Sequence, residues 1–334
     1  MWRWSKWRKR STWGVILACA LAFDGVDLRA FAPASPMALQ LARRATVERA
    51  QALRHHAARR AVASGTVSSE ALLEETGTTV ALRSPRETRV LLVGTAHVSA
   101  NDAARVRRII AAEQPGAVVL ELDEHRLPRL NLTLEMLGDL VVVPSTPAPI
   151  ATGHTAFAPW DPRDWAAAAA APLLRVVLSK MYDSLAARGM QAGGEFAAAI
   201  DEGRRVGARL VLGDVESVAT IEAFLRRLAR TNPLDLMRRY SAVMKEELGA
   251  FAGDRELTPE LVERLKADFV AQPRVFERLR DEVPEFYDAF IRVRDVRLAS
   301  AISEEEARGS APIVAVVGLG HLSGVEAALA WPRA

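Results

Sequence analysis

"LVGTAHVSANDAA" (residues 92–104) and "VVGLGHLSGVEAA" (residues 316–328) are two versions of one pattern in the same chain. In each, a β-branched apolar run ends at a glycine, a histidine follows three residues later, and small helix-forming residues come next. His97 and His321 occupy the same place, 321 − 97 = 224 positions apart. The pattern predicts a strand, a sharp turn at the glycine and a helix, occurring twice.

Four short apolar runs indicate strands that are buried on both faces of a sheet. They are residues 88–94, 116–122, 208–214 and 312–318. A helical pattern that stops at Pro115-Gly116 joins the first two runs, which predicts a right-handed β-α-β unit. We therefore expect an α/β fold over residues 85–332, with a small central β-sheet built from two related strand–GxxH–helix halves and a large helical insertion.

The insertion follows from the helical periodicity of the middle of the chain. Residues 163–189 predict one helix or two, interrupted at Pro172, and residues 285–309 predict a continuous helix. Asn232 and Thr258 are candidate helix caps. Residues 151–162 predict a loop.

The first part of the chain has the composition of a targeting leader. Residues 1–30 combine a cationic start with an apolar run of about eleven residues, which is typical of a signal peptide and too short to span a bilayer. Residues 31–84 are rich in Ala, Arg and Ser, as transit peptides are. With Phe31 at the junction, the leader resembles the two-part presequences that direct proteins to secondary plastids. The secretory pathway, a mitochondrion and an uncleaved membrane anchor are the alternatives.

The charge distribution argues against a nucleic-acid partner. Residues 1–70 hold 12 of the 44 Lys and Arg but only 4 of the 41 acids, so the remainder carries 44 − 12 = 32 bases and 41 − 4 = 37 acids. The high isoelectric point therefore belongs to the leader, and the rest is mildly acidic. Because Cys19 is the only cysteine, a metal site in the folded part must use histidine and carboxylate ligands.

Two histidines and two acids fall where parallel strands are predicted to end. His97 and His321 follow their strands closely, while Glu121 and Asp214 close the second and third strands. Ligands usually bind at this carboxyl edge of an α/β sheet. Two imidazoles and a carboxylate form a metal site with open positions for water and substrate, which suits zinc, manganese or cobalt. Without a metal, Glu121 or His97 is the candidate general base.

Structural roles are the alternative for each of these side chains. A histidine after a strand often caps the next helix or bonds a neighbouring loop. Glu121 has Arg126 and His125 close by in the sequence as partners, and Asp214 is a candidate N-cap.

Six motifs in order resemble the TraB/PrgY family, which is related to the Tiki proteins and more distantly to erythromycin-esterase-like and ChaN-like proteins. The motifs are "VGTAHVS", "VVLELDEHR", "GGEFAAAI", "LVLGDVESVAT", "RDVRLASAI" and "VAVVGLGHLSGV", spread over residues 88–330. The resemblance implies that His97, Glu121 and His321 hold a metal or carry hydrolysis, as is thought for Tiki-type metalloproteases.

By the same resemblance, Glu195, Asp214, Arg294 and Asp295 fall on the family's other polar motif positions. We expect the site to be lined by Gly94, Gly318, Arg126, Asp214, Arg294 and Asp295. Two positions depart from the family pattern, because Val215 and Val293 stand where relatives commonly have Arg and Glu.

The leading interpretation is a metal-dependent hydrolase, in its narrower form a metallopeptidase, that acts on a peptide or small molecule. Glu121 or Glu195 serves in it as ligand or as base for the attacking water. The alternative is a non-catalytic module that binds a peptide or haem at the same place. A third interpretation is an organelle-membrane organising protein, which would associate peripherally with a membrane.

Overall fold

The computed structural model describes residues 78–96, 100–138, 141–142, 160–187, 193–248 and 274–333. The predicted signal segment, nearly all of the predicted transit segment, His97 and the predicted cap Thr258 lie outside these residues. The described fold starts earlier than the predicted boundary at residue 85, because β1 (Thr79–Arg83) already belongs to the sheet.

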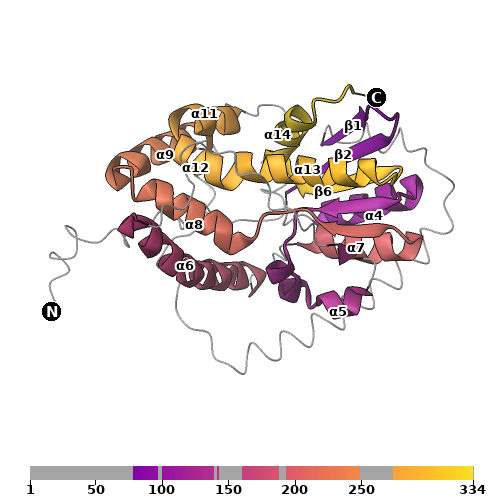
Figure 1. Cartoon of the computed structure of the whole chain (residues 1–334), viewed down its shortest axis with the longest axis horizontal. Coiled ribbons are helices and arrows are strands. Elements are labelled where there is room, and N and C mark those ends of the chain that lie inside the picture. The colour runs from indigo at the N-terminus through magenta and orange to yellow at the C-terminus, as the bar shows by residue number, and fades with distance from the viewer. Residues whose placement is uncertain are drawn as a thin grey trace. The chain divides into compact units, whose positions relative to one another are not determined.

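A six-stranded sheet in the order β1-β2-β6-β3-β5-β4 organises the described residues (Figure 1). β1 is antiparallel to β2, and all the other neighbours are parallel. The four predicted strands are confirmed as β2 (Arg89–Thr95), β3 (Ala117–Leu120), β5 (Arg209–Leu212) and β6 (Ile313–Gly318). The two edge strands, β1 and the two-residue β4 (Val141–Val142), were not predicted.

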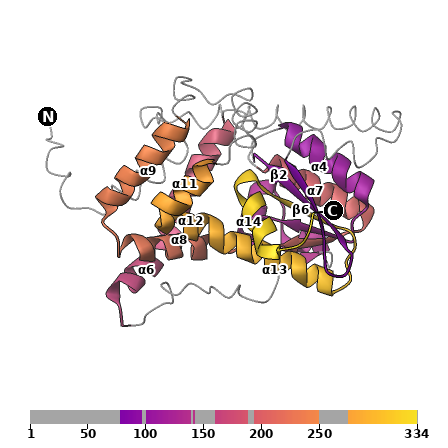
Figure 2. The ribbon, with the colours of Figure 1, turned by 90° about the horizontal axis from the view of Figure 1, so that it is seen from above.

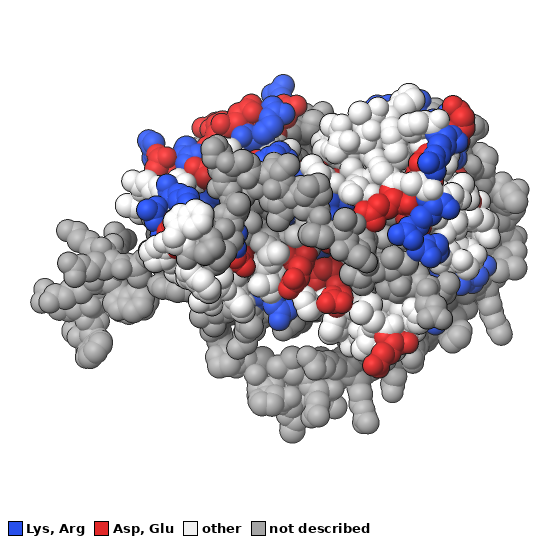
Figure 3. Space-filling view, viewed as in Figure 1, with Lys and Arg blue, Asp and Glu red and all other residues white. Residues whose placement is uncertain are grey.

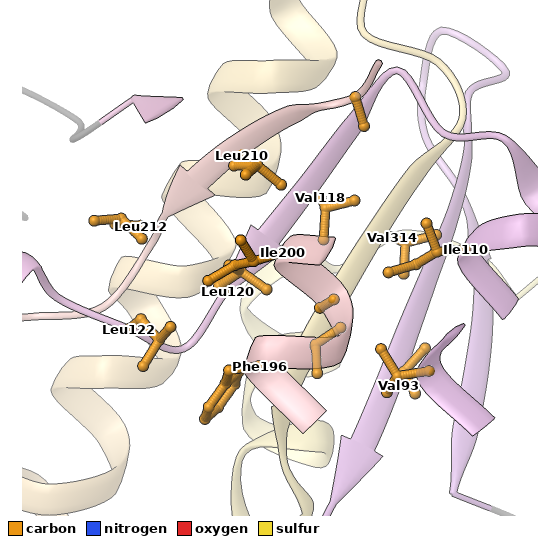
Figure 4. Packing of buried hydrophobic residues seen from close by; sticks show 14 of the residues in the cluster. Val93, Ile110, Val118, Leu120, Leu122, Phe196, Ile200, Leu210, Leu212 and Val314 are labelled. Atoms are coloured by element: carbon orange, nitrogen blue, oxygen red, sulfur yellow. The ribbon is translucent and has the colours of Figure 1, made fainter. Parts of the chain in front are cut away.

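Helices cover both faces of the sheet, which explains why the central strands are apolar throughout. α4 (Ala100–Glu113) and α7 (Gly194–Val206) pack on one face. Figure 4 shows Ile200 of α7 lying beside Leu120 of β3, with Phe196 nearer to Leu122. α13 (Val293–Ala307) and α14 (Leu319–Leu329) pack on the other face through residues such as Leu298.

The two Gly-x-x-His segments continue differently after the strand. α14 begins directly after Gly318, so His321 lies in the first helical turn, whereas α4 begins only at Ala100, five positions after the end of β2. The two helices also cover opposite faces of the sheet. The α/β class is therefore confirmed, but the relation of the two halves is not, and it stays a prediction.

The remaining helices form a group beside the sheet (Figures 1 and 2). η3 (Glu124–Leu130) and the short α5 (Leu134–Leu137) follow β3. The group itself consists of α6 (Pro162–Ala187), α8 (Ser217–Leu228), α9 (Pro233–Leu248), α11 (Arg274–Glu282) and α12 (Pro284–Tyr287). α6 is one helix that runs through Pro172, and Asn232 caps α9 by accepting from the N–H groups of Leu234 and Asp235.

A π-helical turn, η6 (Asp288–Arg292), separates α12 from α13, where the sequence predicted one regular helix. Phe286 before the turn and Phe290 within it pack with Phe224 of α8. After it, Asp295 and Leu298 are buried, so the buried side moves by one position across the turn. Because of the extra residue, the segment packs against the helical group before the turn and against the sheet after it.

α13 runs antiparallel to the parallel strands. Its last turn holds Glu305, which bonds Arg209 at the start of β5, while Arg294 in its first turn bonds Asp214 beyond the end of β5. The start of α13 and the helical group that precedes it therefore lie at the carboxyl edge of the sheet.

Surface charges of both signs are interspersed over the face shown in Figure 3. Within the described ranges, none of the helices has the length and apolar character needed to cross a membrane.

Truncating the core on either face of the sheet should destabilise the protein by a similar amount. Ile110 of α4 and Ile302 of α13 are completely buried, so Ile110→Ala and Ile302→Ala should each lower the free energy of unfolding by about 2–5 kcal/mol. Val296→Ala, at an exposed position of α13, should stay within about 0.5 kcal/mol. Urea unfolding checks all three, and a harmless Ile302→Ala would contradict the packing of α13 on the sheet.

Candidate functional site

Polar groups from three strand ends and two helices meet at the carboxyl edge of the sheet. Glu121 follows β3, Asp214 follows β5 and Gly318 ends β6. Arg294 comes from the first turn of α13, and His321 comes from the first turn of α14. The structure thus brings together five of the positions that the sequence singled out.

The Glu121 carboxylate lies at the centre of this group. Only 1% of the Glu121 surface is exposed to solvent. Oε2 accepts the backbone N–H of Gly318 at 2.5 Å, and Oε1 accepts from Nη2 of Arg294. Nε2 of His321 lies 3.5 Å from Oε1. One buried carboxylate therefore contacts β6, α13 and α14.

Arg294 joins Glu121 to Asp214. Its Nε donates to Oδ1 of Asp214 at 2.8 Å and its Nη2 to Oδ2 at 2.6 Å, a bidentate pair. Its Nη1 donates to the carbonyl oxygen of Phe290 in the π-helical turn at 3.4 Å. Burial alone would lower the pKa of Arg294, but Asp214 and Glu121 raise it above its ordinary value. Arg294 therefore stays charged although the protein largely encloses it.

Arg126 also bonds Asp214. Its Nη1 donates to Oδ2 of Asp214 at 3.0 Å and to the main-chain oxygen of Glu121 at 2.9 Å. Its guanidinium carbon lies 6.0 Å from the ring centroid of Phe196 in α7. The two arginines supply positive charge beside Asp214, where Val215 supplies none.

His321 is held by Asp295, the next residue of α13. Nδ1 of His321 lies 2.6 Å from Oδ1 of Asp295, and both residues are buried. Burial raises the pKa of Asp295 above its ordinary value, and the hydrogen bond with His321 opposes that rise. In the neutral tautomer that donates its Nδ1 proton to Asp295, the lone pair of Nε2 points toward Glu121.

Gly324 makes room for this pair, since a methyl group on its Cα would overlap Oδ2 of Asp295. Gly94 leaves space in the same way for the side chains of Leu319 and Leu322 in α14. Gly318 has an ordinary φ of −65°, so the turn after β6 does not depend on the conformational freedom of glycine.

His321 and Glu121 are suitably placed as two ligands of one cation. The 3.5 Å between Nε2 and Oε1 leaves room for an ion that bonds both atoms at about 2.0–2.2 Å. A carboxylate on the other ring nitrogen is the usual support of a metal-binding histidine. Within the described ranges, no three or more His, Cys, Asp or Glu residues are arranged so that together they could hold a metal ion. His97, the third predicted ligand, lies outside these ranges.

The structural alternatives from the sequence are settled in part. The side chain of Glu121 bonds Arg294, whereas Arg126 takes its main-chain oxygen. Asp214 is not an N-cap: α8 has Glu216 at that position, and Asp214 bonds the two arginines. Glu195 is buried in the first turn of α7, whose N-terminal end lies at the carboxyl edge because its C-terminal end leads into β5.

Two buried groups that the sequence analysis did not single out lie nearby. Oδ2 of Asp102 accepts the N–H of Ala96 at 2.9 Å, and Arg105 donates to the carbonyl oxygen of Gly94. Asp102 and Arg105 thus fix the backbone just before residue 97. Their i, i+3 spacing on a predicted helix could have indicated the ion pair from the sequence. Asp123 caps η3 by accepting the N–H of His125 at 2.8 Å.

Comparison with known proteins agrees with the motifs. The chain matches the model of the TraB/PrgY/gumN family over residues 80–331, which covers β1 to α14. An uncharacterized protein of Methanocaldococcus jannaschii is 25% identical over 241 residues, which make up 72% of this chain and 53% of that protein. The chain thus spans about half the length of this curated relative.

Replacing Gly324 should displace Asp295 from His321. Gly324→Ala adds a methyl group where the Asp295 carboxylate lies, so we expect a net loss of about 1–3 kcal/mol of stability despite alanine's higher helix propensity. Ser323→Ala, at the exposed neighbouring position of α14, is the matched control. Urea unfolding of both variants checks the prediction. Equal stability of the two would contradict the close packing of Asp295 on α14.

The stability of the protein should depend on ionisation of Asp123. Burial, its largest influence, raises the pKa of Asp123 above the ordinary value despite the attraction of Arg126. The folded protein therefore keeps this proton to higher pH than the unfolded chain, so ionisation costs stability as pH rises through the folded pKa. Asp123→Asn retains an oxygen for the cap on His125.

Asp123→Asn should gain stability over the parent protein as pH rises from about 4 to about 7.5. Urea unfolding at both pH values measures this difference, with the exposed Asp201→Asn as control. A difference that shrinks with rising pH would show that the pKa of Asp123 is lowered instead.

Proposed function

Because the chain belongs to the TraB/PrgY/gumN family, we propose that it is a metal-dependent hydrolase, and in the narrower form a metallopeptidase. One observation carries the proposal. His321 is oriented by Asp295 through Nδ1, and its Nε2 lies 3.5 Å from Oε1 of the buried Glu121. An imidazole fixed in this way presents a lone pair beside a carboxylate, at the edge where α/β proteins bind ligands.

The donor set suits zinc, manganese or cobalt, which accept imidazole nitrogen and carboxylate oxygen. His321 and Glu121 would hold the ion, and we propose His97 as the third ligand. A metal bound there would lower the pKa of a water molecule and polarise the bond to be hydrolysed.

The other residues of the site keep these ligands in place. Arg294 and the Gly318 N–H fix the two oxygens of Glu121, and Asp295 fixes the ring of His321. Arg294 compensates the negative charge of Glu121 and Asp214 at once. We assign Glu195, at the N-terminal end of α7, as the base that takes a proton from the attacking water.

A binding module without turnover is the second candidate function. Arg294 is bonded to the same Oε1 that faces His321, so one fixed cation already lies beside Glu121. Arg126 and Arg294 together neutralise Asp214. The two arginines thus pair with the carboxylates of Glu121 and Asp214 without a metal ion. The ligand would be a peptide in preference to haem, because His321 is only 4% exposed.

Location and partners remain part of the proposal. We propose a peptide or small-molecule substrate, no nucleic-acid partner, and delivery to a plastid by the leader, with the secretory pathway or a mitochondrion as alternatives. Peripheral association with a membrane is compatible with this scheme.

Metal analysis of the full-length protein tests the hydrolase proposal. After incubation with zinc, manganese or cobalt and removal of the excess, the protein should retain about one ion per chain. His321→Gln, Glu121→Gln and His97→Gln should lose it. Asp295→Asn, which removes only the support of the ring, should weaken metal binding about 10–100-fold.

His125→Gln is the matched control, because His125 is the histidine of η3 and its side chain is 44% exposed. It should retain the metal, and circular dichroism should show that every variant is folded. Full metal content in His321→Gln would refute the site. A parent protein that retains none of the three ions would leave the binding module as the function.

A further inference from the structure

The two arginines of the site use their guanidinium groups to different extents. Arg294 donates from all three nitrogens, to Glu121, Asp214 and the Phe290 carbonyl. Among the described residues, Arg126 donates from Nη1 alone. Its side chain is also more open, 27% exposed against 16% for Arg294. Every nitrogen of Arg294 therefore bonds the protein, whereas Nε and Nη2 of Arg126 have no partner among the described residues.

The orientation of Arg126 is fixed even though most of its donors are unused. Nη1 is bonded to both the Glu121 main chain and Asp214, and the ring of the buried Phe196 lies beside the guanidinium group. Within the described part of the chain, the N–H groups of Nε and Nη2 have no hydrogen-bond partner. These two nitrogens form one edge of the guanidinium group. Their N–H groups are parallel and can donate to two oxygens side by side.

We propose that Arg126 binds a carboxylate group of the substrate through this Nε–Nη2 edge. The inference deepens the proposed function, on which it rests, by naming the substrate class: a molecule with a free carboxylate. A planar carboxylate matches the two parallel N–H groups of a fixed arginine, which loses little conformational freedom on binding. The position is also suitable, because Arg126 bonds the main chain of Glu121, whose side chain faces His321.

Among the described residues, Asp214 and Asp123 interact with the charge of Arg126. Asp214 is bonded to Nη1 and shares its own charge with Arg294. Asp123 lies within electrostatic range, but no hydrogen bond joins it to Arg126 among the described residues. The Nε–Nη2 edge is therefore left for a ligand.

The test is nuclear magnetic resonance of the full-length protein labelled with 15N-arginine. The Arg126 Nε–H signal is assigned by its loss in Arg126→Lys. Titration with N-acetylalanine should shift this signal to saturation at millimolar concentration, and the neutral N-acetylalaninamide should bind at least tenfold more weakly. The Arg294 signal should not move, since its nitrogens are occupied.

Arg126→Lys keeps the charge but removes the fork, so it should weaken N-acetylalanine binding at least tenfold as measured by calorimetry. Arg107→Lys, at an exposed position of α4, is the control and should bind like the parent protein. Equal binding of acid and amide, unchanged affinity in Arg126→Lys, or no saturable shift would overturn the proposal. Tighter binding of inorganic phosphate than of N-acetylalanine would overturn the assignment to carboxylate.

The result is independent of the test of the hydrolase proposal. Arg126→Lys should retain the bound metal, because Arg126 is not among the proposed ligands. Carboxylate binding in a protein without metal would remove the hydrolase proposal and leave Arg126 as the anchor of a binding module. Metal binding without carboxylate selectivity would support the hydrolase proposal and remove the role proposed for Arg126.

Discussion

The architecture of the carboxyl edge depends on how the buried carboxylate of Glu121 is compensated. A buried charge costs several kcal/mol unless charge and hydrogen bonds replace its water. Here the Gly318 N–H, the Arg294 guanidinium and the His321 ring surround the two oxygens. Each comes from an element distant in sequence, so satisfying one side chain fixes β3, β6, α13 and α14 against one another. Arg294 extends the constraint to β5 through Asp214.

This constraint explains the irregular helix that enters the site. Arg294 and Asp295 must face the sheet edge from the first turn of α13, while Phe286 and Phe290 must pack in the helical group. A regular α-helix repeats every 3.6 residues and would keep one buried stripe through both regions. The π-helical turn adds one residue and changes the stripe, and Arg294 bonds the carbonyl of Phe290 within it. The site and the helical group are therefore parts of one packing arrangement.

Strands and strand-end acids were predictable, because continuous apolar runs are a local signal and parallel strands end at one edge. The contact partners were not. Arg294 is 173 positions from Glu121, and no periodicity reports such a pairing. The role of Gly324 depends on Asp295 of another helix and was equally hidden. The repeat suggested that both histidines belong to equivalent halves, whereas the helices after β2 and β6 lie on opposite faces. Shared sequence phrases here mark two strand ends at one edge and do not establish equivalent modules.

The central claim is that Glu121 and Arg294 stabilise the fold as a coupled pair. A double-mutant cycle of Glu121→Gln and Arg294→Met, read by urea unfolding of the full-length protein, tests it most directly. Arg294→Met should cost about 3–5 kcal/mol, because it leaves buried carboxylates uncompensated. In the presence of Glu121→Gln the same change should cost at least about 1 kcal/mol less, since one of those charges is gone. Equal costs in both backgrounds would show that the two side chains act independently and would contradict this account.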